Sequence, residues 1–90
     1  MLTNIIFQNR LYCEVQLGSA RILENSFQLK FVSNLNDGFE MTYFADEIED
    51  VDAFYKELYQ LLENASKNEK VLSESDLKMV CMKAVDYANS

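Results

Sequence analysis

The stretch from Asp46 to Ala65 constrains the fold most, because its apolar residues recur at the spacing of a helix. At about 100° per residue they gather on one side of that helix. The apolar stripe consists of Ile48, Val51, Tyr55, Leu58 and Leu62, and it is widened by Phe54, Leu61 and Ala65. Asp46 is the expected N-cap, with Glu49 as its capping-box partner. The stretch therefore predicts an amphipathic helix over residues 47–65.

A second helix is predicted over residues 74–88, after a polar link at residues 66–70. Ser73 or Ser75 can cap it, because a serine hydroxyl accepts hydrogen bonds from the backbone N–H groups of a first helical turn. Its predicted inner face comprises Leu77, Val80, Cys81, Ala84, Tyr87 and Ala88.

Met79 and Met82 fall on the polar side of this second helix. Exposed methionines are typical of an adaptable protein-binding surface. The alternative is that both pack against the apolar N-terminal residues Leu2, Ile5 and Ile6. The sequence leaves these two interpretations open.

The N-terminal half, residues 2–45, predicts an antiparallel meander of four to five short strands, because apolar and polar side chains alternate along it. The predicted strands are residues 2–7 (or a helical turn), 11–17, 20–23, 27–33 and 39–44. Gly18-Ser19 has the composition of a two-residue type II′ turn, which would make a hairpin there. Asp37-Gly38 is a second hairpin signal.

A run of strands followed by two helices indicates an α+β fold, with both helices packed on one face of the sheet. Ninety residues suffice for one modest core, so we expect a single domain over residues 1–90. Lys30 and Glu40 lie on polar strand faces and are expected to pair across their hairpin. Cys13 and Cys81 are expected to be reduced core residues, because each lies on an apolar face and they are far apart in the chain.

The composition disfavours catalysis. The chain has no histidine, and its two glycines, Gly18 and Gly38, are isolated. It therefore lacks the commonest general base, the commonest neutral metal ligand and a phosphate-cradling glycine-rich loop. The two cysteines do not have the spacing of a zinc site, and the acids at residues 46–52 do not have that of a calcium-binding EF-hand loop. We therefore expect no enzymatic activity, no cofactor and no metal site.

The acidic residues are concentrated in one part of a chain whose net charge is −7. Residues 37–63 contain nine acids and one base, whereas the remaining residues carry a net charge of +1. Such a field disfavours direct contact with nucleic acid or an anionic membrane and favours a basic protein surface. The predicted partner-binding residues are Asp37, Glu40, Glu49, Asp50, Asp52, Glu57, Tyr59 and Glu63. An ordinary solvated surface is the alternative interpretation of these acids.

No apolar run is long enough to span a membrane, and the N-terminus lacks the basic region and cleavage site of a signal peptide, so we expect a cytoplasmic location. In size, acidity and strands-then-helices layout, the chain is similar to small phage-encoded antagonists of host nucleases, such as anti-CRISPR proteins. This resemblance implies an inhibitor of a basic, nucleic-acid-binding enzyme. In its sharpest version, carboxylates stand in for the phosphates of nucleic acid. A structural or accessory module that self-associates, for example as a homodimer, is the alternative function.

Overall fold

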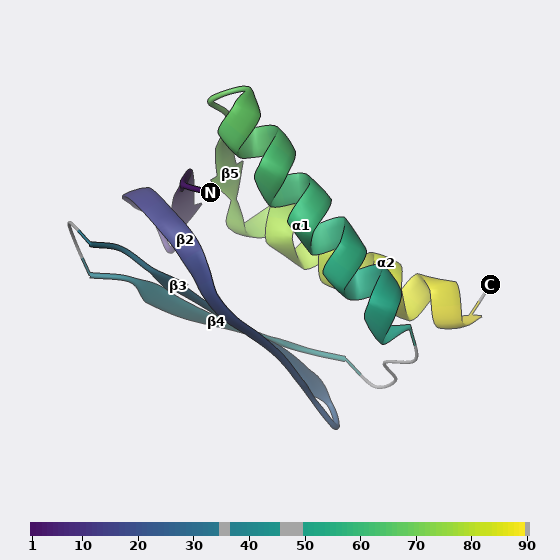
Figure 1. Ribbon diagram of the computed structural model, residues 1–90. Coiled ribbons are helices and arrows are strands. Elements are labelled where there is room, and N and C mark those ends of the chain that lie inside the picture. The colour runs from purple at the N-terminus through teal and green to yellow at the C-terminus, as the bar shows by residue number, and fades with distance from the viewer. Residues whose placement is uncertain (35–36, 46–49, 90) are drawn as a thin grey trace.

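Two helices cover one face of a twisted sheet, as Figure 1 shows. The computed structural model describes residues 1–34, 37–45 and 50–89, and of residues 84–89 it describes the helical backbone alone. In chain order the elements are β1 (Thr3–Phe7), β2 (Arg10–Leu23), β3 (Ser26–Val32), β4 (Phe39–Phe44), α1 (Val51–Lys67), β5 (Val71–Ser73) and α2 (Glu74–Asn89). The predicted α+β class, a strand meander with helices on one sheet face, is confirmed.

Among the described residues the sheet has five strands, in the order β4-β3-β2-β1-β5. The first four pair antiparallel with their neighbours in the chain, as a meander requires. The sequence pattern does not predict β5, which lies between the helices and pairs in parallel with β1. Leu72, in the middle of β5, is fully buried and pairs with Ile5. The sheet is therefore mixed, and the link between the helices contributes to the core.

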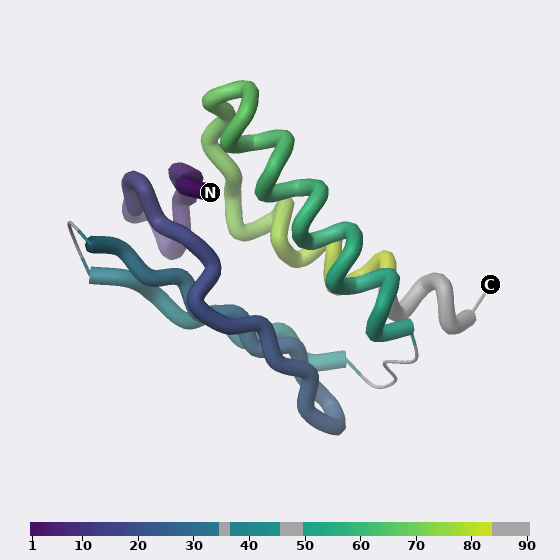
Figure 2. The backbone as a smooth tube through the Cα atoms, viewed as in Figure 1, coloured from purple at the N-terminus to yellow at the C-terminus, as the bar shows by residue number. Residues whose placement is uncertain are grey.

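The longest strand, β2, runs without a break through Gly18 and Ser19, so the predicted hairpin there is wrong. The register with β3 shifts between Leu17 and Ser19, which marks a bulge at the glycine. A Cβ at Gly18 would lie 3.0 Å from Cγ1 of Val32, so a larger residue would be crowded there. Figure 2 follows β2 as one long curved strand. The glycine accommodates a bend in the strand and does not reverse the chain.

A second bulge in β2 lies at Glu14, whose φ angle is 52°. The pairing of β1 with β2 shifts between Thr3 and Ile5, so β2 carries one extra residue at this point. Val15 is consequently buried, whereas Cys13 is exposed. The prediction that Cys13 belongs to the core is therefore wrong, because the bulge changes which residues of the strand face inward.

β1 and β2 are joined by a tight turn at Gln8 and Asn9, whose φ angles are 50° and 64°. Two positive φ angles between the paired residues Phe7 and Arg10 identify a type I′ turn. The twist of this turn type matches that of the strands it connects. Of the two interpretations of residues 2–7, the strand is therefore confirmed.

The core lies between the inner face of the sheet and the two helices. From the sheet it contains Ile5, Phe7, Val15, Phe27, Leu29, Phe31, Phe39, Met41 and Leu72, and from the helices Phe54, Leu58, Leu62, Ala65, Leu77, Val80 and Cys81. Phe54 packs against Phe27 with 4.7 Å between ring centroids. Tyr55 is partly buried, and its hydroxyl donates to the C=O of Ala20 at 3.1 Å. Val51 is exposed, contrary to prediction, because the buried arc of α1 is centred on the side of Phe54.

α1 begins at Val51, with Asp50 as its N-cap. Oδ1 of Asp50 accepts a hydrogen bond from the backbone N–H of Ala53 at 2.9 Å. This bond satisfies one of the N–H groups that a first helical turn leaves without a partner inside the helix. Residues 46–49 of the predicted helix start lie outside the described residues, and they include the expected cap Asp46 and its expected capping-box partner Glu49.

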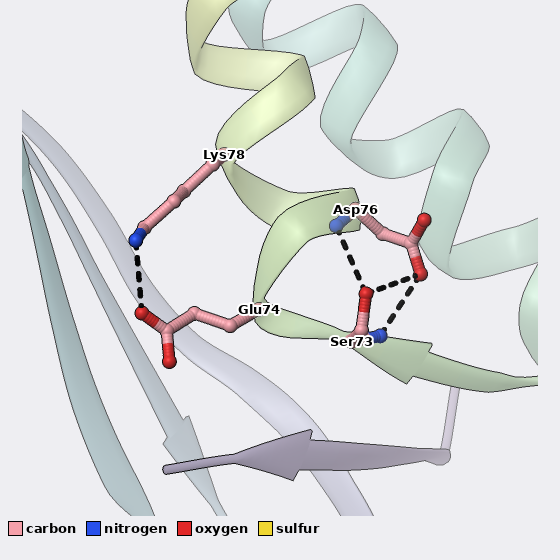
Figure 3. Close-up of polar contacts among 4 residues, drawn as sticks. All are labelled: Ser73, Glu74, Asp76 and Lys78. Atoms are coloured by element: carbon pink, nitrogen blue, oxygen red, sulfur yellow. Dashed lines mark hydrogen bonds and ion pairs between the residues drawn. The ribbon is translucent and has the colours of Figure 1, made fainter.

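α2 begins after Ser73, which bonds reciprocally with Asp76 as Figure 3 shows. Oγ of Ser73 accepts from the backbone N–H of Asp76 at 3.2 Å. Oδ2 of Asp76 accepts from the backbone N–H of Ser73 at 2.9 Å and from its hydroxyl at 3.1 Å. This is a capping box with aspartate in the place of glutamate, so of the two predicted caps Ser73 is confirmed. The side chains at residues 84–88 of the predicted inner face lie outside the description.

Candidate protein-binding site

The sheet face that points away from the helices has an exposed aromatic residue at one end. Leu23, Ser26 and Phe44 form one row across three strands, because Ser26 pairs with both of the others. The neighbouring row contains Phe27, which is fully buried against α1, so strand alternation directs the row of Phe44 outward. Phe44 is 76% exposed and Leu23 is 44% exposed. These two side chains are called the Phe44 patch below.

The Phe44 patch lies at the end of the sheet from which the chain leaves for α1. The backbone N–H of Ala45 donates to the C=O of Asn25 at 3.0 Å, and this bond ties the end of β4 to the turn between β2 and β3. Figure 1 shows the start of α1 at the same end of the molecule. Val51 and Asp52 are exposed there. The Phe44 patch and Asp52 thus lie at one end of the protein, the patch on the outward face of the sheet and Asp52 on α1.

β4 is an edge strand of the sheet, and its backbone groups alternate in direction. The bond from Ala45 to Asn25 continues the register of β3 with β4, so odd-numbered residues of β4 bond toward β3. The N–H and C=O groups of Glu40, Thr42 and Phe44 therefore point toward the open side of the strand. The Phe44 patch adjoins an edge whose alternate backbone groups face outward.

The predicted partner-binding residues on α1 do not make a uniformly acidic face. Exposed along one stripe of the helix are Asp52, Tyr59 and Glu63. The exposed Lys56 lies within this stripe. Glu57 reaches α2 instead, where its Oε2 lies 3.4 Å from Nζ of Lys83. Because α1 contains three acids and two bases, its net charge is −1.

The other predicted partner-binding residues are distributed over the molecule. Asp50 is half-buried at the helix cap, and Glu49 lies outside the described residues. Glu40 projects from the outward face of β4, where its Oε1 lies 4.0 Å from Nζ of Lys30, as the predicted pair requires. Asp37 is exposed beside the turn between β3 and β4, which Figure 1 places at the end of the sheet away from the start of α1. Those of the predicted acids that the structure describes are not gathered into one surface.

Two further groups of apolar side chains are exposed. Met79 and Met82 on α2 are exposed, so the prediction that they pack against the N-terminal residues is wrong. Ile6 and Leu11 pair directly across β1 and β2, and both are exposed on the sheet face that the helices leave open. Val71 on β5 is also exposed. These residues form candidate contacts separate from the Phe44 patch.

Cys81 is a free cysteine that is fully buried in the core. Burial raises the pKa of the Cys81 thiol from 9.0 to about 12, because desolvation of the thiolate outweighs a backbone hydrogen bond that lowers the pKa. The thiol is therefore protonated at neutral pH and inert as a nucleophile. Within the described part of the chain, no group of three or more His, Cys, Asp and Glu side chains is placed to hold a metal ion.

Neither helix, over the residues described, has the length and apolarity that crossing a membrane requires. The chain matches no protein-family model, no curated protein and no solved structure. The arrangement of its helices and strands defines an α+β protein.

The Phe44 patch is only partly visible in the sequence. Alternation with the inward residues Phe39 and Met41 directs Phe44 to the outer face, so that signal is present in the strand pattern. Leu23 is different, because the bulge at Gly18 reverses the alternation before the strand reaches it. Its exposure on the same row as Phe44 depends on that bulge.

Proposed function

We propose that the protein is a small, non-enzymatic binding module that contacts a basic protein partner through the Phe44 patch. The observation that supports this proposal is the 76% exposure of Phe44. Covering an aromatic side chain of this size contributes roughly 1.5–3 kcal/mol. Aromatic anchors at the centre of an interface supply much of its binding energy. Leu23 in the same row would enlarge the apolar contact.

Charge defines the class of partner in this proposal. The net charge of −7 attracts basic surfaces over a range set by the ionic strength. The exposed Asp52 lies at the same end of the molecule as the Phe44 patch. Charges at the rim of an apolar contact mainly raise the association rate and select the partner. The expected partner therefore presents an apolar pocket within a basic surface.

More specifically, we propose that the protein is an antagonist that occupies the nucleic-acid-binding surface of a basic enzyme, as phage-encoded inhibitors do. Imitation of the phosphate backbone by α1 alone is not the form that the geometry favours. The helix has 17 residues and a net charge of −1. Duplex DNA carries roughly fifteen charges over the roughly 25 Å that such a helix spans. The antagonist would therefore combine apolar contact at Phe44 with scattered carboxylates.

Capture of partners from a cell lysate, identified by mass spectrometry, tests the proposal. Phe44→Thr removes the ring but keeps a residue that favours strands. Leu11→Thr is the matched control, because Leu11 is also an exposed apolar residue on the outward sheet face. We expect the native protein and Leu11→Thr to retain one basic nucleic-acid-handling protein that Phe44→Thr loses. Equal capture of that protein by Phe44→Thr would contradict the proposal.

Self-association is the second candidate function, and the exposed pair Ile6 and Leu11 favours it. Their outward position beside Val71 gives the sheet a second apolar area, which another copy could cover. Sedimentation velocity over a range of protein concentrations tests this candidate. A dimer that dissociates in Leu11→Lys and persists in Phe44→Thr would support it, and a monomer at every concentration would refute it.

A further inference from the structure

We propose that the basic partner contributes an extended segment that adds to the free edge of β4 as a sixth strand. This inference rests on the proposed function, since it specifies how the partner reaches the Phe44 patch. Strand addition to an exposed sheet edge is a general mode of peptide recognition, in which main-chain hydrogen bonds supply affinity and alternate side chains supply specificity.

The backbone of β4 is arranged to receive such a strand. The N–H and C=O groups of Glu40, Thr42 and Phe44 point to the open side, because the intervening residues bond to β3. The register with β3 is regular from Ser26–Phe44 to Phe31–Phe39, without a bulge. Three alternate residues with backbone groups on the open side would give an added antiparallel strand a complete ladder.

The two edge strands of the described sheet differ in how readily each can pair with another chain. Short length, bulges, prolines and lysines are the usual devices that keep a sheet edge from pairing with another chain. β5 is only three residues long, so its edge offers little to pair with. β4 has six residues, no register shift with β3 and neither proline nor lysine. The β4 edge is therefore the one suited to receive a strand.

The side chains of β4 define the pattern of the added segment. Met41 and Tyr43 face inward beside the core, so the residues opposite them are expected to be apolar. Glu40 and Phe44 face outward. Glu40 has Lys30 on its β3 side, 4.0 Å away, and can pair with a lysine or arginine of the segment on its open side. A second basic residue suits the face of the Phe44 ring. The segment is thus expected to alternate between apolar and basic residues.

A second copy of this chain is a poorer occupant than a basic segment. Two copies each carry a net charge of −7 and repel one another. A basic segment is instead attracted by the same net charge.

Hydrogen exchange measured by NMR on the nitrogen-15-labelled protein tests the inference directly. The probe is an N-acetylated, C-amidated peptide of alternating valine and lysine. In the free protein, the amides of Met41 and Tyr43 are expected to be protected, whereas those of Glu40, Thr42 and Phe44 exchange quickly. Saturation with the peptide is expected to slow exchange at Glu40, Thr42 and Phe44 at least about tenfold, the effect of one net hydrogen bond.

Two matched peptides separate backbone pairing from other contacts. In the added strand the outward lysines pair with the outward residues of β4, so their N–H groups face the edge. N-methylation of the lysines is therefore expected to abolish protection, whereas N-methylation of the valines preserves it. On the protein, Thr42→Pro removes one N–H from the open side and is expected to weaken peptide binding by about tenfold, with Thr42→Val as its control.

The possible outcomes distinguish this inference from the proposed function. The inference is overturned if the valine–lysine peptide leaves those three amides unprotected, or if lysine N-methylation has no effect. Salt-sensitive binding of that peptide at another surface of the protein would refute the β4 edge as the binding site. It would leave the proposed function intact. Equal binding of a valine–glutamate peptide would overturn the proposed function, because the partner need not then be basic. If exchange at these three amides slows as the protein concentration rises, with no peptide present, a second copy of the chain occupies the edge. That result would refute the choice of a basic segment.

Discussion

The backbone N–H of Glu14 donates a hydrogen bond to Oδ1 of Asn4 at 2.9 Å, within the bulge that leaves Cys13 exposed. Glu14 adopts a φ of 52°, a left-handed conformation that is unfavourable for residues with a side chain. Glu14→Gly should therefore be more stable than Glu14→Ala by about 1 kcal/mol. Urea denaturation of the two variants measures the difference. An alanine variant as stable as the glycine variant would show that this backbone conformation is absent.

Leu58 is fully buried in the centre of the helix–sheet contact. Leu58→Ala is expected to lower the free energy of unfolding by about 2–5 kcal/mol, because it leaves a cavity in the core. The neighbouring Tyr59 is exposed, so Tyr59→Ala is the control and should change stability by no more than about 0.5 kcal/mol. Similar urea midpoints for native protein and Leu58→Ala would refute the packing of α1 on the sheet.

Ser73 and Asp76 satisfy each other's backbone N–H groups at the start of α2. Ser73→Ala is expected to cost about 1 kcal/mol of stability, the usual effect of losing a polar N-cap. Ser75 is exposed two residues later and provides the control, since Ser75→Ala should be nearly neutral. Thermal unfolding of both variants measures the contrast. A larger loss for Ser75→Ala would mean that the helix is capped at the other serine.

Cys81 makes stability depend on pH in the alkaline range. Burial raises its pKa to about 12, from 9.0 for a solvated thiol. The unfolded chain therefore loses this proton at lower pH than the folded protein does, so the associated stability is fully present below pH 9.0 and is lost as pH rises toward about 12. Urea midpoints measured across this window should fall more steeply for Cys13→Ser than for Cys13→Ser combined with Cys81→Ala. Parallel slopes would show that the Cys81 thiol is solvated in the folded protein.

The extent to which the sequence predicts this structure differs between helices and strands. The helical stripes place Leu58 and Leu62 in the core correctly, because an amphipathic period over many residues tolerates an error in where the helix begins. Strand faces are less robust, since a single extra residue exchanges the two faces. The bulges at Glu14 and Gly18 do this in β2, which is why Cys13 is exposed and the predicted hairpin is absent.

The candidate site was predictable to a smaller degree. The acids are expected to share one face, but tertiary structure directs Glu57 toward Lys83. This pairing joins two helices, so the helical period of α1 contains no information about it. The Lys30–Glu40 pair, in contrast, follows from the strand pattern of its hairpin. Phe44 is likewise predictable, because strand alternation alone directs it outward.

The dependence of partner affinity on salt tests the central claim most directly. For the partner captured by the native protein, titration calorimetry at several ionic strengths would compare two double variants. Asp50→Asn with Asp52→Asn removes two charges at the start of α1 and keeps a polar N-cap. Glu14→Gln with Glu69→Gln removes two exposed charges, one in β2 and one after the end of α1 that is opposite to Asp52.

We predict that the native affinity falls steeply as salt rises, because rim charges are screened. The Asp50 and Asp52 variant should bind more weakly and with a flatter salt dependence, whereas the Glu14 and Glu69 variant should follow the native protein. An affinity independent of salt, or the same change in both variants, would contradict recognition of a basic partner at the Phe44 patch.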